Sequence, residues 1–104
     1  MNSVVMLGRV VKPIVTRKTD HGLNVVNVEV EVERNSSNSE GNYDSDIYSV
    51  TAWKDLALKC QKDLKVNDLI IIKGYLAAKS FKTKNENPFY YSEIIASSVK
   101  VINN

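Results

Sequence analysis

Residues 47–66 read IYSVTAWKDLALKCQKDLKV, and the period of the apolar residues changes within this stretch. In its first half Val50 and Ala52 alternate with Thr51 and Trp53, which predicts a strand over 47–54 with the tryptophan on its outer, wetter face. In its second half the apolar residues share one stripe of a helix over 54–66, namely Leu56, Ala57, Cys60 and Leu64. The sequence therefore predicts a strand that runs directly into a short helix capped by Asp55.

The remainder of the chain has the patterns of strands. We predict strands over 3–11, 25–34, 69–81 and 89–102, with polar loops at 35–45 and 82–88 and a turn at 20–22. Gly8 marks a bend. In the second strand valines alternate with outward carboxylates, which are Glu29, Glu31 and Glu33. The element order predicts an all-β fold, a five-stranded OB-fold Greek-key barrel with one short helix between strands 3 and 4.

Composition limits the possible functions. The 104 residues suit a single domain over 1–104, and a net charge of +2 requires any basic footprint to be local. The only cysteine, Cys60, excludes an internal disulfide and a cysteine-based metal site, and we assign it to the core. The only histidine, His21, lies in a turn. We expect a cytoplasmic protein that is not an enzyme and has neither a cofactor nor a metal.

Three segments together resemble the bacterial-type single-stranded DNA-binding proteins (the SSB family). They are SVVMLGRVVKPIVTRKTDHGLNVVNVEVEV at 3–32, WKDLALKCQKDLKVNDLIIIKGYL at 53–76 and YYSEIIASSVKVI at 90–102. The resemblance is collinear over almost the whole chain. It implies an OB-fold that binds single-stranded DNA without sequence preference, by base stacking and phosphate neutralisation, and protects exposed strands in replication, recombination and repair.

The resemblance also implies a set of DNA-binding residues. Trp53 and Phe81 occupy base-stacking positions, and strand alternation places Lys73, Tyr75 and Lys79 on the face of Phe81. Tyr75 suits a contact between subunits equally well. Cations with positional support are Lys54, beside Trp53, and Lys82 and Lys84, in the loop after Phe81. Further candidate cations are Arg9, Lys12, Arg17 and Arg34.

Some positions depart from the family pattern. The family often has aromatic residues where this chain has Ile47 and the polar run 34–36. The three outward glutamates would repel phosphates, so we expect weaker binding than that of a typical member. At the start of the last strand we expect part of an aromatic cluster to lie in the core, the cluster being Phe89, Tyr90 and Tyr91.

Self-association and other partners complete the expectations. The apolar run 4–7 fits a strand that is buried on both faces, and the resemblance implies a homotetramer, with a homodimer as the alternative. Family members usually continue into an acidic tip, whereas this sequence ends in VINN, so we expect no acidic C-terminal tail that recruits other proteins. Two alternatives stay open: a tailless accessory protein similar to primosomal replication protein N, and an OB-fold protein-interaction module without DNA affinity.

Overall fold

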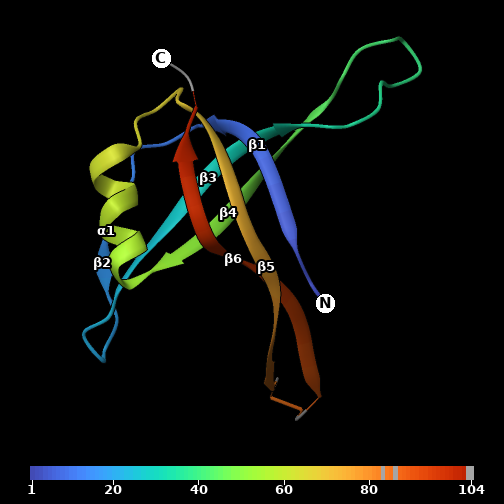
Figure 1. Cartoon of the computed structure of the whole chain (residues 1–104). Coiled ribbons are helices and arrows are strands. Elements are labelled where there is room, and N and C mark those ends of the chain that lie inside the picture. The colour runs from blue at the N-terminus through green and yellow to red at the C-terminus, as the bar shows by residue number, and fades with distance from the viewer. Residues whose placement is uncertain (83, 86, 103–104) are drawn as a thin grey trace.

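The computed structural model of the chain describes residues 1–82, 84–85 and 87–102, and its described part forms one helix and six strands. Figure 1 labels these elements. These elements are β1 Val4–Val10, β2 Arg17–Lys18, β3 Asn24–Glu33, β4 Ser45–Trp53, α1 Lys54–Asp63, β5 Leu69–Lys82 and β6 Pro88–Val101. The strand order is β1-β5-β6-β4-β3-β2, and an additional pairing of β1 with β3 closes a ring of five strands. Among the strands of the described residues, only β4 and β6 pair in parallel. The predicted OB-fold is confirmed.

Three local features differ from the prediction. The two-residue strand β2 was not predicted, and it pairs with the start of β3. The helix ends at Asp63 because Leu64 takes an extended backbone, with φ −97° and ψ 132°, while its N–H still bonds to the Cys60 carbonyl. The N-cap is Trp53, without a side-chain hydrogen bond, and Asp55 lies in the first turn. There its carboxylate still suits the positive end of the helix dipole.

The core is built mainly from the inward residues of β3, β4 and β5. Val28 and Val30 lie opposite Val50 and Tyr48 in the β3–β4 register, and all three valines are fully buried. The helix α1, between β4 and β5, adds Ala57 and Cys60 to this cluster. Burial raises the pKa of the Cys60 thiol to about 11, so it is a neutral core group at physiological pH.

Two glycines allow the strands to come close enough to close the barrel. At Gly8, β1 moves from β5 towards β3, and a Cβ atom there would collide with the Glu31 carbonyl. At Gly74 a Cβ atom would collide with the Ile95 carbonyl. Beside Gly74 the register of β6 shifts by one residue, because Lys73 pairs with Ser98 and Gly74 with Ala96. The bend predicted at Gly8 is therefore explained by close backbone approach.

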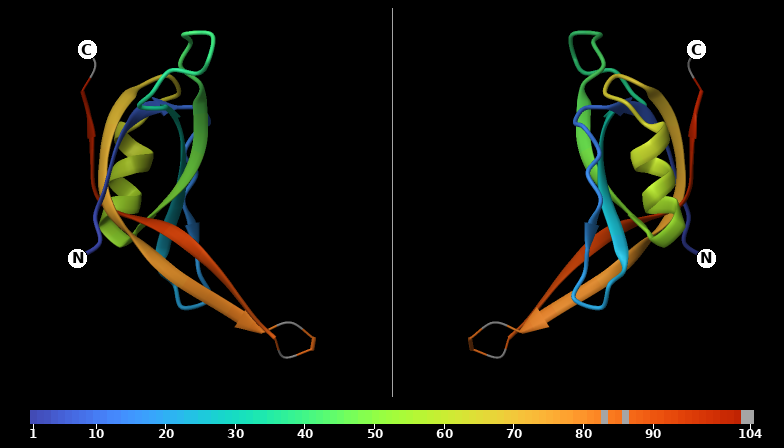
Figure 2. Two further views of the ribbon diagram at one scale, coloured as in Figure 1. Left: turned by 90° about the vertical axis from the view of Figure 1, so that its right-hand side faces the viewer. Right: turned by 90° about the vertical axis from the view of Figure 1, so that its left-hand side faces the viewer.

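Beyond this bulge β5 and β6 continue as a long hairpin. Figure 2 shows the hairpin projecting from the barrel, with its tip far from α1. Its base is held by Asn2, whose side-chain amide donates to the Leu76 carbonyl at 2.6 Å and accepts from the Leu76 N–H at 2.9 Å. Among the described residues no helix has the length and hydrophobicity to cross a membrane.

Candidate nucleic-acid interface

One row of residues crosses the outer surface of four strands. Thr51 of β4 pairs with Asn27 of β3 on one side and with Ile95 of β6 on the other, and Ile95 pairs with Tyr75 of β5. Paired residues point to the same side of a sheet, so these four side chains share one face. The row joins the surface that carries Trp53 to the surface that carries the β5–β6 hairpin.

Trp53 lies two residues beyond Thr51 on this outer face. Its partner in β3 is Val25, which also pairs with Arg17 of β2. Val25 is fully buried although it is not part of the core cluster, so its neighbours on the outer face cover it. Trp53 itself is partly exposed. The predicted orientation of Trp53 is confirmed, and the partly exposed indole stands beside the buried Val25.

A short hydrogen-bonded chain lies next to Trp53. An Nη2 N–H of Arg17 donates to Oδ1 of Asn27 at 3.0 Å, and Nδ2 of Asn27 donates to Oγ1 of Thr51 at 3.1 Å. Thr51 is a polar residue of the sheet, yet its side chain is buried, with 4% of its surface exposed. No local pattern distinguishes Arg17 from other cations in the sequence, because its placement depends on β2, which has only two residues.

The far part of the hairpin carries an aromatic cluster. The Phe81 ring centroid lies 5.0 Å from that of Phe89 and 6.1 Å from that of Tyr91, and each ring is about half exposed. Tyr91 pairs with Lys79, so this lysine shares the face of the cluster. Aromatic rings that stay accessible offer faces on which nucleobases stack.

The expectation that part of the cluster at 89–91 lies in the core is wrong. Phe89, Tyr90 and Tyr91 are 52%, 71% and 47% exposed, because the hairpin carries them beyond the barrel. Alternation from Phe89 would have placed Tyr91 with Phe81 and Tyr90 on the opposite face. The predicted grouping of Tyr75 and Lys79 with Phe81 is borne out by the β5–β6 register. Lys73 keeps the same alternation, because the extra residue at the bulge is Ser97 of β6.

Several predicted cations remain available for a ligand. They are exposed and form no ion pair with any described residue: Lys54, Lys73, Lys79, Lys82 and Lys84. Lys54 begins α1 directly after Trp53, with φ 59°. Lys82 ends β5, and Lys84 lies in the turn at the hairpin tip. Three of these lysines therefore lie close in sequence to the aromatic cluster.

Other predicted residues lie elsewhere and are already engaged. Arg34 donates to both carboxylate oxygens of Asp46, at 2.9 and 3.0 Å, which raises the pKa of Arg34 and lowers that of Asp46. Lys12 lies 3.2 Å from the Glu29 carboxylate, and Arg9 donates to the Asn67 carbonyl at 2.9 Å.

Ile47, which was also predicted to bind DNA, is 62% exposed but lies opposite Glu31 in the β3–β4 register. The three outward glutamates, at 29, 31 and 33, occupy alternate positions along this part of β3. The end of the outer face that carries Ile47 thus holds three carboxylates, with Arg9 beside Glu31 and Lys12 beside Glu29, and the structure does not bring Ile47, Arg9, Lys12 or Arg34 together with the hairpin.

Known proteins resemble this chain in sequence and in fold. Its sequence is 26% identical over 102 residues to the single-stranded DNA-binding protein of Oceanobacillus iheyensis, covering 98% of this chain and 63% of that protein. Single-stranded DNA-binding protein 2 of Staphylococcus aureus strain COL is 28% identical over 102 residues, and 73% of its length is covered. A crystal structure of a deletion mutant of the single-stranded DNA binding protein from Thermus aquaticus superposes with a TM-score of 0.80 at 16% identity.

The superposition covers 99% of this chain and 51% of the Thermus aquaticus chain, and this likeness supports the fold. The family model that matches residues 1–102 is described as the single-strand binding protein family. The match spans nearly the whole chain, so this protein belongs to the single-strand binding protein family.

Proposed function

We propose that this chain binds single-stranded DNA without sequence preference, by stacking bases on aromatic rings and by neutralising phosphates. The observation that carries the proposal is that Trp53 and the aromatic cluster at Phe81 lie on one face of the sheet. The paired residues Thr51, Ile95 and Tyr75 join them on that face. Exposed lysines flank that surface at both ends. Rings and cations that alternate along one face suit a flexible strand with a charged backbone.

The proposed role follows from this mode of binding. Stacking on a ring uses the face of a base, which every base has, so the chain would hold any exposed strand and keep it from re-pairing. Such a protein acts in replication, recombination and repair by binding. Its functional residues contact the DNA and do not catalyse a reaction. We assign stacking to Trp53 and Phe81, and phosphate contacts to Lys54, Lys79, Lys82 and Lys84.

The affinity of this chain is expected to be modest. The carboxylates of β3 oppose phosphate binding at one end of the outer face, and Arg34 and Lys12 are already paired with carboxylates there. The strand is therefore restricted to the path between Trp53 and the hairpin.

The test is a titration with oligo-dT at several salt concentrations, read by Trp53 fluorescence. Stacking on the indole predicts quenching, and phosphate contacts predict that log affinity falls linearly with log salt. An interaction module without DNA affinity predicts no change in fluorescence at any salt concentration. An oligo-U of equal length, bound as tightly as oligo-dT, would reassign the ligand to single-stranded nucleic acid in general.

We also propose that the chain self-associates as a homotetramer. Val5 and Leu7 on the outer face of β1 are 62% and 51% exposed, and they lie beside Lys73 and Ile71 of β5. Two large apolar side chains on one strand favour burial by another copy. Light scattering tests this: Leu7→Glu should reduce the solution mass. A homodimer, as in the alternative resemblance to primosomal replication protein N, would give about half the mass of the tetramer.

A further inference from the structure

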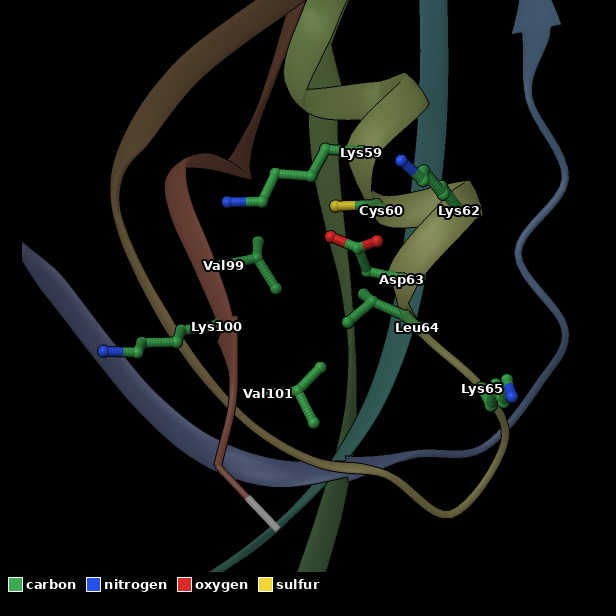
Figure 3. A pocket seen from close by; sticks show the side chains of 9 residues that line it. All are labelled: Lys59, Cys60, Lys62, Asp63, Leu64, Lys65, Val99, Lys100 and Val101. Atoms are coloured by element: carbon green, nitrogen blue, oxygen red, sulfur yellow. The ribbon is translucent and has the colours of Figure 1, made fainter. Parts of the chain in front are cut away.

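The two halves of the β5–β6 hairpin are held differently. Figure 3 shows the half of β6 that belongs to the barrel, where Val99 and Cys60 of α1 line one cleft, and both residues belong to the core cluster. Residues 77–82 of β5 and 88–93 of β6, in contrast, pair only with each other among the strands of the described residues. This outer half, the hairpin arm, carries the aromatic cluster at Phe81. The direction of the arm is therefore set where it leaves the barrel.

Asn2 makes a contact at the point where the arm begins. The last paired residues of the β1–β5 ladder are Val4 and Gly74, so two positions further along both strands Asn2 stands opposite Leu76. Nδ2 of Asn2 donates to the Leu76 carbonyl at 2.6 Å, and Oδ1 accepts from the Leu76 N–H at 2.9 Å. A hydrogen-bonded pair in an antiparallel ladder exchanges two such bonds, so the side-chain amide takes the place of a backbone partner. Asn2 thus extends the ladder to the residue directly before the arm.

The hairpin has its bend next to this contact. The bulge residue Ser97 lies there, and at Gly74 the backbone approaches the Ile95 carbonyl so closely that a Cβ atom would collide with it. Bulges and strand glycines are where strands bend. Phe81 lies five residues beyond Leu76, which is about 17 Å along a strand. A swing of about 10° at the bend would therefore move the Phe81 ring by about 3 Å, comparable to the spacing of about 3.4 Å between successive bases.

Asn2 lies outside the surface that we assign to DNA. Continued to residue 2, the alternation of β1 places Asn2 on the face opposite to that of Val5 and Leu7. Its amide oxygen and nitrogen are both engaged with Leu76, and the side chain carries no charge. An effect of Asn2 on DNA binding would therefore have to act through the arm.

We propose that Asn2 is a positioning residue for DNA binding, which fixes the direction of the hairpin arm so that the Phe81 cluster and Trp53 engage the same strand. The proposal rests on the proposed function. It adds to the determinants of affinity a residue that stands before β1 and does not touch the ligand. Figure 1 shows the N-terminal end of the chain beside the place where the hairpin leaves the barrel.

The experiment measures oligo-dT affinity in two backgrounds. In the wild-type background Asn2→Ala should weaken binding by about fivefold, the low end of the cost of one stacking contact, and should leave the salt slope unchanged. The second background is Phe81→Ala/Phe89→Ala/Tyr91→Ala, whose arm has lost the three rings of the cluster. There Asn2→Ala should have no further effect, because the arm no longer carries rings that need placing. The matched control is Asn38→Ala, which also removes two side-chain bonds to backbone N–H groups but in the loop before β4, and it should bind normally in both backgrounds.

Hydrogen exchange reports on the contact itself. In Asn2→Ala the Leu76 N–H should exchange faster, whereas that of Ile72, which is fully buried, should keep its rate. Faster exchange at Ile72 as well would contradict a role confined to the arm, since Asn2 would then support the whole barrel. Normal affinity of Asn2→Ala, or an equal loss in both backgrounds, would overturn the positioning role while leaving the proposed function intact. Failure of the wild-type protein to bind oligo-dT would overturn the proposed function and this inference together.

Discussion

Trp53 and Val25 lie directly opposite each other in the β3–β4 register, and Val25 is fully buried although it faces away from the core. Cross-strand partners have Cβ atoms about 4.5–5.5 Å apart, so the indole starts beside the valine. Trp53 is also partly exposed and stands directly before α1. The same side chain therefore stands next to a buried apolar residue and presents part of its ring to solvent.

This double position predicts the behaviour of Trp53→Ala. The affinity for oligo-dT should fall by about 1–3 kcal/mol at fixed salt, because a stacking contact is lost. The salt slope should stay the same, because no charge is removed. Stability should fall by less than the roughly 3–5 kcal/mol typical of a fully buried tryptophan. Thermal melting and titration of the same samples measure both effects, with Trp53→Phe as a control that keeps a ring. If a folded Trp53→Ala protein bound oligo-dT normally, Trp53 would pack in the fold without stacking on a base.

The hairpin offers a comparison between its two faces. Phe81→Ala should weaken oligo-dT binding by about 1–3 kcal/mol, because Phe81 lies in the ring cluster with Phe89 and Tyr91. Tyr90→Ala removes a ring of similar size that is 71% exposed on the opposite face, so it should leave affinity unchanged. Equal losses for the two variants would mean that the face of the hairpin does not matter.

Much of this arrangement could be predicted from periodicity. The change of period at Trp53 located the helix, and alternation placed Val28 and Val30 in the core and Trp53 on the outer face. Alternation also grouped Tyr75 and Lys79 with Phe81. These predictions succeeded because strand geometry is local and each strand keeps its period of two.

The rest depends on contacts between distant segments. Whether Phe89 and Tyr91 are core or surface is decided by how far the hairpin extends beyond the barrel, which alternation within one strand does not specify. The pairing of Arg34 with Asp46 joins the ends of two strands across a loop. The two-residue strand β2 exists only because β3 offers it a partner, so Arg17 had no local signal.

Two lysines near the hairpin tip test the phosphate path. Lys79→Ala/Lys82→Ala should flatten the slope of log affinity against log salt by roughly one to two, at about −0.7 per phosphate. The comparison is Arg34→Ala/Asp46→Ala, which removes an exposed ion pair at the other end of the β3–β4 ladder. That pair has no net charge, so its loss should leave the slope as it is. If Lys79→Ala/Lys82→Ala left the salt slope unchanged, the DNA backbone would not contact these lysines.

Cys60 predicts a pH dependence of stability. Burial raises its pKa to about 11, above the value of about 8.5 for an exposed thiol. The folded state favours the neutral thiol, so the stabilisation is fully present below about pH 8.5 and is lost as the pH rises towards 11. Denaturant unfolding of wild type and Cys60→Ala between pH 8 and 11 measures this: the wild type should lose more stability across the window. Iodoacetamide should also react slowly at pH 8 until denaturant is added, and rapid alkylation of the folded protein would contradict the buried position.

The chain of hydrogen bonds from Arg17 through Asn27 to Thr51 predicts coupling between residues that do not touch. Arg17→Ala should weaken oligo-dT binding and flatten the salt slope by about 0.7, if its guanidinium contacts one phosphate. Thr51→Val keeps the shape of the side chain but removes the acceptor for Asn27, so Arg17 is held less firmly while its charge remains. We therefore expect Thr51→Val to weaken binding without changing the slope.

The double variant Arg17→Ala/Thr51→Val tests whether Thr51 affects DNA binding only through Arg17. If Thr51 acts on binding only by positioning Arg17, its substitution should have no further effect once the arginine is absent, and the two losses should not add. Melting of each protein controls for the fold, since the loss of one hydrogen bond costs stability only about 0.5–1.5 kcal/mol. Additive losses of affinity would mean that Thr51 and Arg17 contribute to binding independently. The hydrogen bonds between Arg17, Asn27 and Thr51 would then only support the sheet.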